Sequence, residues 1–297
     1  MYPAPFDYVR CEGIEQALEL LAQHGGEAKV LAGGQSLIPM MKLRLVRPAL
    51  VLDINRIPGL NDLRADDGDL HVGALVRHRD IVESSLVRDR LFMMVEAART
   101  VADVQVRNLG TPCGSIVHAE PAGDWGPVAL ALNARLRVRS RRGEREIAGS
   151  DIFVDAYQSS LAEDELATEV IFPIPQAPAG GAYLKMVRRA GDFPVASVAA
   201  MVVLDEGGAC RDVGIGLGGA AMTSLKATAA EAALRGQRPT EPAIRAAAEE
   251  AARATDPLED IRGSAQYKRE LVAVLCRRAL EAAVKRARGE EARAGIA

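Results

Sequence analysis

The chain has 297 residues, a length that fits two or three domains better than one hydrophobic core. Hydrophobic residues make up 48% of it and charged residues 26%, which is the balance of an ordinary soluble globular protein and excludes a disordered or fibrous chain. Lys and Arg number 37 against 40 Asp and Glu, so the net charge of -3 offers no positive excess for binding nucleic acid.

The cysteine residues are too far apart to form a metal site by themselves. They are Cys11, Cys113, Cys210 and Cys276, and no C-x-x-C pair occurs. This spacing fits neither zinc nor an iron–sulfur cluster held by this chain alone, and it is typical of reduced thiols in a cytoplasmic protein. The sequence also has no signal-like N-terminus and no apolar run of about 18 residues, so we expect neither secretion nor a membrane span.

The first 60 residues predict a small αβ unit. Apolar residues at helical spacing indicate a helix over 14–23, and a strand over 29–32 ends at Gly33 and Gly34. A second helix begins at Leu37 with Ser36 in position to cap it, and 50–53 is the next strand. The unit ends near 58–59, where turn-forming residues gather.

The middle of the chain predicts strands around one helix and a long loop. Strands are expected at 71–73, 136–138 and 169–172, and an amphipathic helix at 88–101. The Gly- and Pro-containing stretch 110–127 indicates an irregular loop, and the arginine-rich run 135–145 the solvent face of a hairpin. Three prolines and two glycines mark 173–181 as a linker.

The last third of the chain predicts strands followed by helices. Extended runs at 182–188, 196–204 and 211–217, separated by glycine turns, indicate an antiparallel meander. The alanine-rich stretch 227–254 and the apolar pattern from Tyr267 to Ala279 indicate the closing helices. No internal repeat is evident.

Two glycine-containing loops could bind an anion. The first, 32–36, joins a strand to a helix start, where glycine lets main-chain N–H groups approach a phosphate. The second, 105–115, combines small residues with hydroxyl groups. Either loop alone is better explained as a tight turn, and neither matches a Rossmann or P-loop fingerprint. Together they support the hypothesis of a bound dinucleotide diphosphate.

Four motifs are distinctive. They are Pro-x-x-Phe-Asp-Tyr at 3–8, Leu-Ala-Gly-Gly-Gln-Ser-Leu-Ile-Pro at 31–39, Ala-Asp-x-Gln-Val-Arg-Asn-x-Gly-Thr at 102–111, and Gly-Asp-Phe at 191–193 after Lys185. With these motifs the sequence resembles the FAD-binding medium subunit of the xanthine dehydrogenase and carbon monoxide dehydrogenase family of molybdenum hydroxylases. The resemblance runs nearly end to end.

The resemblance implies an α+β fold with two parts. Residues 1–176 would form a two-subdomain FAD-binding module of the PCMH type, with subdomains at about 1–57 and 58–176. Residues 177–297 would form a smaller C-terminal domain, a three-stranded antiparallel sheet with helices.

The resemblance also implies which residues contact FAD. The two loops would hold the diphosphate, Asp124 would lie near the ribose, Leu161 and Lys185 would line the cofactor cleft, and Phe193 would lie beside the isoalloxazine ring. No catalytic or metal-binding residue is implied. The full implied set is Ala32, Gly33, Gly34, Gln35, Ser36, Leu37, Ala102, Thr111, Gly114, Ser115, Asp124, Leu161, Lys185 and Phe193.

The second loop departs from the family pattern at Pro112 and Cys113, where the family has Ile or Leu followed by Gly. Pro112 has no N–H to donate, and a side chain at Cys113 would be unfavourable if that position needed a positive φ or a close backbone approach. The departure puts the affinity for FAD in question.

By the same resemblance, this chain is an electron-transfer subunit. Substrate would be oxidised on a large molybdenum-cofactor subunit, and electrons would pass through two [2Fe-2S] clusters of a small subunit to FAD and then to an external acceptor. The assembly would be a dimer of heterotrimers in the cytoplasm. Because substrate would bind elsewhere, this sequence does not select among carbon monoxide, purines, other N-heterocycles and aldehydes.

Two alternative functions remain: a free-standing FAD-dependent reductase or oxidase, and a scaffold subunit that has lost FAD.

Overall fold

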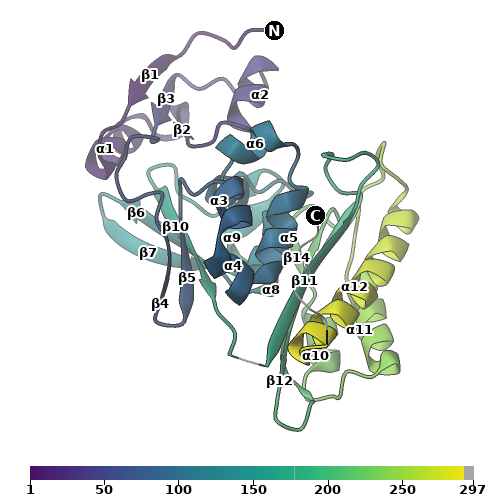
Figure 1. The fold of residues 1–297 in the computed structure, drawn as a ribbon. Coiled ribbons are helices and arrows are strands. Elements are labelled where there is room, and N and C mark those ends of the chain that lie inside the picture. Colours follow the sequence, from purple (N-terminus) through teal and green to yellow (C-terminus); the bar gives the residue numbers. More distant parts are fainter. Residues whose placement is uncertain (177, 291–297) are drawn as a thin grey trace.

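The computed structural model describes residues 1–176 and 178–290. Its larger sheets follow one another along the chain, and Figure 1 shows the first at the top, the second below it on the left and the third on the right beside the last helices. Each sheet borders its own hydrophobic core.

The first sheet is parallel, with strand order β1-β3-β2. The helix expected at 14–23 and the strands expected near 29–32 and 50–53 are confirmed. The first strand was not predicted, because it lies at a sheet edge and three of its four side chains are exposed. The elements are β1 (Asp7–Arg10), α1 (Ile14–His24), the 3₁₀ turn η1 (Gly25–Glu27), β2 (Ala28–Leu31), α2 (Leu37–Lys42) and β3 (Leu50–Asp53).

The second sheet is antiparallel, with order β4-β5-β10-β6-β7. Alternate residues of its central strands, such as Val72, Val138 and Val170, are fully buried in a core shared with the neighbouring helices. The strands are β4 (Leu63–Asp66), β5 (Asp69–Gly73), β6 (Arg135–Ser140), β7 (Gly143–Ala148) and β10 (Leu166–Pro173), and a separate hairpin is formed by β8 (Phe153–Asp155) and β9 (Gln158–Ser159).

The helices between these strands correct two predictions. The helix expected at 88–101 is two helices that meet at Leu91, and the loop expected at 110–127 contains a helix beginning at Pro112 and another beginning at Trp125. Proline is compatible with the first turn of a helix, so Pro112 marks a helix start. The helices are α3 (His78–Glu83), α4 (Ser85–Arg90), α5 (Phe92–Thr100), α6 (Val104–Leu109), α7 (Pro112–His118), α8 (Trp125–Ala131) and α9 (Gly149–Ile152).

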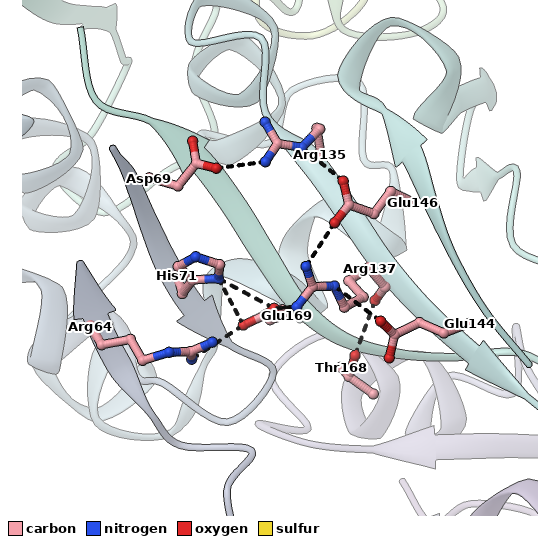
Figure 2. Close-up of polar contacts among 9 residues, drawn as sticks. All are labelled: Arg64, Asp69, His71, Arg135, Arg137, Glu144, Glu146, Thr168 and Glu169. Atoms are coloured by element: carbon pink, nitrogen blue, oxygen red, sulfur yellow. Dashed lines mark hydrogen bonds and ion pairs between the residues drawn. The ribbon is translucent and has the colours of Figure 1, made fainter. Parts of the chain in front are cut away.

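The other face of the second sheet carries a network of charged side chains, shown in Figure 2. Glu169 lies at its centre, paired with Arg137, with Arg64 at 3.4 Å and with His71 at 3.3 Å. Arg135 continues the network to Asp69 at 2.6 Å and to Glu146 at 2.8 Å. The arginines of β6 therefore lie on the polar face of a hairpin, as their alternation with apolar residues predicts.

The third sheet is antiparallel, with order β11-β12-β13-β14. The expected meander is confirmed, and a two-residue strand extends it. The expected linker at 173–181 is shorter than predicted, because Gly180 and Gly181 already pair with Val202 and Met201. The elements are β11 (Ala179–Met186), β12 (Ala196–Leu204), β13 (Cys210–Gly218), β14 (Leu225–Lys226), α10 (Thr228–Leu234), α11 (Glu241–Arg253) and α12 (Ala265–Ala287).

The third sheet is covered on both faces. Helix α12 packs against β11 and β12, while α5 and α8 of the preceding part contact β11, β12 and β13. Every residue of β12 is accordingly buried, which explains why all of them except Ser197 are apolar. Within the ranges that the structure describes, no helix has the length and apolar character needed to cross a membrane.

Candidate functional site

The two glycine loops lie in direct backbone contact. Gly33 follows β2, Leu109 is the last residue of α6, and Gly110 lies between α6 and α7. A Cβ atom on Gly33 would be 2.3 Å from the carbonyl oxygen of Leu109 and 2.7 Å from the Cα atom of Gly110. Only glycine allows this approach. Loops separated by more than 70 residues in the sequence therefore form one continuous backbone surface.

The first loop presents unpaired backbone donors. The N–H groups of residues 33–36 have no hydrogen-bond acceptor within the described part of the chain. Gly34 adopts a φ of 72°, and the side-chain amide of Gln35 donates to the carbonyl oxygen of Gly33 at 3.1 Å. The expected cap by Ser36 is wrong, because its side chain accepts no bond from the backbone of α2. Its hydroxyl is thus left available to another partner.

The second loop is the start of α7. The Thr111 hydroxyl accepts a bond from the N–H of Gly114 at 3.0 Å, and the N–H of Ser115 donates to the Thr111 carbonyl oxygen at 3.0 Å. Pro112 is the first residue of the helix, where it interrupts no bond of the helix. Gly114 is exposed and Ser115 half-buried, beside the buried Thr111.

Cys113 corrects the expectation that its position might need a positive φ. It lies in the first turn of α7 and is absent from the residues with positive φ. Its side chain is 2% exposed and belongs to the core of the second sheet. Burial raises the pKa of the thiol to about 12, so the sulfur is neutral. Cys113 is a core residue under the loop, and the geometry gives no reason for it to weaken a ligand contact.

A buried ion pair lies where the third sheet meets the second part of the chain. The Lys185 Nζ atom donates to Asp124 Oδ1 at 2.9 Å, and the Tyr183 hydroxyl donates to the same oxygen at 2.6 Å. The two charged side chains are only 5% and 8% exposed. Burial raises the pKa of the Asp124 carboxyl, while Lys185 and Tyr183 act in the opposite direction. The ammonium and the hydroxyl thus hold the carboxylate in one orientation.

Glycines on β13 bring this pair together. A Cβ on Gly214 would be 1.9 Å from the Ala131 carbonyl oxygen, and one on Gly216 would be 2.0 Å from that of Pro127. Residues two apart on a strand share a face, so helix α8 packs directly on the strand backbone. Asp124 immediately precedes α8 and is thereby placed beside Lys185 of β11.

Two family models match the chain along almost its whole length. The model described as the FAD binding domain in molybdopterin dehydrogenase matches residues 4–175, and the one described as the CO dehydrogenase flavoprotein C-terminal domain matches residues 181–283. The chain belongs to the FAD-binding subunits of the molybdenum hydroxylases.

Individual relatives agree with this family. The chain is 39% identical to the 6-hydroxypseudooxynicotine dehydrogenase complex subunit alpha of Paenarthrobacter nicotinovorans, over 97% of each chain. It is 36% identical to the carbon monoxide dehydrogenase medium chain of Hydrogenophaga pseudoflava, over 95% of this chain and 98% of that one. A solved structure of carbon monoxide dehydrogenase from Hydrogenophaga pseudoflava, lacking the Mo-pyranopterin moiety of its cofactor, superposes with a TM-score of 0.93 at 39% identity, over 96% of this chain and 99% of that one.

In this flavin subunit, the turn that carries Phe193 lies against another predicted residue, Ala102. Gly191 contacts Ala102, and its Cβ would be 3.1 Å from the Ala102 carbonyl oxygen. Phe193 follows in the same turn, 47% exposed, with the Arg262 guanidinium 5.8 Å from the centre of its ring. The Lys185 Nζ atom also donates to the Asp192 carbonyl oxygen at 3.4 Å, which ties the turn to the buried pair.

The remaining predicted residues lie at the margins of these groups. Leu37 is the first residue of α2 and half-buried, next to the first loop. Leu161 is partly buried and packs against the core of the second sheet. Its place near FAD stays a prediction.

Sequence reasoning missed several polar residues that surround the loops. Asn55 and Arg77 bond to backbone atoms of the two loops, and Tyr183 bonds to Asp124. His78 is buried and accepts a hydrogen bond from the indole N–H of Trp125 at 3.1 Å. Only Asn55 could have been found from the sequence, because Asp53-x-Asn55 is a polar pair at the end of an apolar strand. The other contacts join residues that are far apart in the sequence.

Proposed function

We propose that this chain binds FAD across its two glycine loops and passes electrons from [2Fe-2S] clusters of a partner subunit, through FAD, to an external acceptor. The observation that carries the proposal is the contact between the loops, which gathers unpaired backbone N–H groups on one surface. Such groups suit the two negative phosphates of a dinucleotide. FAD, when bound, supplies the exchange between one-electron and two-electron transfer.

The loop residues would contact the diphosphate through both backbone and hydroxyl groups. The unpaired N–H groups of 33–36 are donors, and the hydroxyl of Ser36 is not used as a cap. The Thr111 hydroxyl accepts a bond from the N–H of Gly114 and can still donate its own hydrogen to a phosphate oxygen. The proposed diphosphate contacts are Ala32, Gly33, Gly34, Gln35, Ser36, Leu37, Thr111, Gly114 and Ser115.

The buried pair and the turn after it would contact the rest of FAD. Asp124 would accept from a ribose hydroxyl, while Lys185 holds the carboxylate in place. The exposed ring of Phe193 offers an apolar surface to the isoalloxazine, and Ala102 lies against Gly191 of the same turn. Leu161 would add an apolar contact.

The proposed assembly contains a large molybdenum-cofactor subunit and a small [2Fe-2S] subunit, as a dimer of heterotrimers in the cytoplasm. The relatives are named as a complex subunit and a medium chain, which supports an enzyme of several chains. The four cysteines of this chain are all buried and free of disulfide bonds. We further propose the domain limits 1–176, with subdomains 1–57 and 58–176, and 177–297.

Purification of the full chain, alone and after co-expression with its partner genes, tests the proposal. We expect an absorption band near 450 nm, release of FAD on denaturation, and co-elution with two other chains that contain molybdenum and iron. A chain with no flavin, even after incubation with FAD, would refute the cofactor assignment. A chain that oxidises an organic substrate alone, with no copurifying subunit, would refute the electron-transfer role.

A further inference from the structure

The contact between the two loops is held by polar side chains outside both loops. Asn55 lies two residues after β3, and its side-chain amide donates to the Ala32 carbonyl oxygen at 2.8 Å. The same amide donates to Asp53 Oδ1 at 2.7 Å, and the Asn55 backbone N–H donates to that atom at 2.9 Å. Because both hydrogens of the amide point to these acceptors, its oxygen faces the opposite way.

Asp53 is itself held in place. The Tyr8 hydroxyl on the neighbouring strand β1 donates to Asp53 Oδ2 at 2.5 Å. Burial by itself would raise the pKa of the Asp53 carboxyl. The hydrogen bonds from Tyr8 and Asn55 outweigh burial, so the pKa of this carboxyl is lowered. The carboxylate therefore stays ionised and accepts from both sides, so the orientation of Asn55 is determined by strands of the first sheet.

Arg77 connects this arrangement to the second loop. It lies just before α3, in the second part of the chain, and one of its terminal nitrogens donates to Asn55 Oδ1 at 2.6 Å. The other donates to the Leu109 carbonyl oxygen. A guanidinium presents two donors in a fixed planar fork, which a lysine cannot do. Arg77 therefore bridges the first loop, through Asn55, and the second loop directly.

We propose that Arg77 and Asn55 are positioning residues that fix the spacing of the two glycine loops and thereby set the affinity of the chain for the diphosphate of FAD. The inference rests on the proposed function, since it assumes that the loops bind this diphosphate. Neither residue needs to touch the ligand. The bonds to the carbonyl oxygens of Ala32 and Leu109 pull together the two backbones whose contact Gly33 permits.

The test uses the full chain and three variants. Arg77→Met removes both donors, Arg77→Lys keeps the charge without the fork, and Asn55→Asp keeps the acceptor for Arg77 but removes the donor to Ala32. We expect the Kd for FAD to rise by about tenfold or more in all three. Arg79→Met is the matched control, because Arg79 lies on α3 two residues after Arg77, is 52% exposed and pairs with Asp80 and Glu83 on the same helix. Its Kd should stay within about twofold of wild type.

Two readouts separate positioning from general destabilisation. Each variant is titrated with FAD at a temperature well below its midpoint of thermal unfolding, and the number of FAD molecules bound per chain gives the folded fraction. A variant that binds one FAD per chain with a higher Kd is therefore folded but has a weaker site. Competition by ADP should weaken by the same factor as FAD binding, because ADP carries the diphosphate without the flavin.

The outcomes distinguish this inference from the proposed function. Wild-type protein that binds neither FAD nor ADP would overturn the proposed function. Wild-type protein that binds FAD, with Arg77→Lys and Asn55→Asp binding it equally well, would overturn the positioning role. If Arg77→Met does not fold, these two milder variants decide the question, and loss of ADP competition in both supports the inference.

Discussion

Gly33 and Leu109 lie so close together that no side chain fits between them, since a Cβ on residue 33 would be 2.3 Å from the Leu109 carbonyl oxygen. The backbone of the second loop cannot yield as a flexible side chain could. The glycine is therefore required by the contact between the loops, whether or not a phosphate also approaches it. The two loops therefore form a single unit, and adding one methyl group at residue 33 tests its geometry.

The first prediction is that Gly33→Ala pushes the loops apart. We expect a loss of about 1–3 kcal/mol of stability from overpacking and a Kd for FAD raised by about tenfold or more. Urea unfolding and flavin fluorescence titration measure the two effects. Gly13→Ala is the control, because a Cβ at Gly13 would meet nothing within 4 Å. Equal behaviour of the two variants would contradict the described contact.

The second prediction concerns the pair of Lys185 and Asp124. Lys185→Met leaves the buried carboxylate with only the Tyr183 hydroxyl as a partner, and breaking a buried pair in this way costs about 3–5 kcal/mol. The double variant Lys185→Met with Asp124→Asn removes the orphaned charge and should regain much of that loss. Urea unfolding of the flavin-free chain at pH 7 compares them. A double variant no more stable than the single one would show that the charge is not the cause.

The third prediction is a dependence of stability on pH that comes from His78. Burial lowers its pKa from 6.5 to about 3, with the nearby Arg107 and Arg77 acting in the same direction. Below pH 6.5 the histidine takes up a proton in the unfolded chain but stays neutral in the folded chain. The free energy of unfolding therefore decreases as the pH falls below 6.5. Between pH 6.5 and 5 this loss amounts to about 2 kcal/mol.

A variant isolates the contribution of this histidine. His78→Gln keeps an acceptor for the Trp125 indole N–H but has no proton to gain, so its free energy of unfolding should fall by about 2 kcal/mol less than that of wild type over this range. His24→Gln, on the exposed end of α1, should follow the wild-type curve. Parallel curves for wild type and His78→Gln would rule out the buried neutral imidazole.

Local patterns in the sequence predicted much of this fold. The apolar run Leu50–Leu52 marks one strand, and the sequence of β12, which is apolar except for Ser197, marks another. Both strands lie where expected. Strand β1 was missed because its side chains are mostly exposed, so no apolar pattern marks it. The stretch 110–127 was misinterpreted because Pro112, a helix-starting residue, was taken as a sign of a loop.

The candidate site, like the fold, could be predicted from the sequence only in part. Both glycine loops could be predicted, since glycines after a strand and a hydroxyl before a helix are local signals. Contacts such as that of Arg77 with Leu109, across 32 residues, depend on how separate elements pack. No periodicity in a single sequence marks such pairs, so Asn55 and Arg77 emerged only from the structure.

The last prediction concerns Glu169, the central carboxylate of the charged face of the second sheet (Figure 2). It is 7% exposed and pairs with Arg64 and Arg137, so Glu169→Gln should destabilise the chain by about 1–3 kcal/mol in thermal or urea unfolding. Glu241→Gln breaks an exposed pair with Arg245, 70% and 61% accessible, and should cost less than about 0.5 kcal/mol. Because this face lies opposite the helices that carry the second loop, FAD affinity should be the same in both variants. If the two variants are equally stable, water screens the charges around Glu169. If Glu169→Gln changes the FAD affinity, this face of the sheet is coupled to the loops.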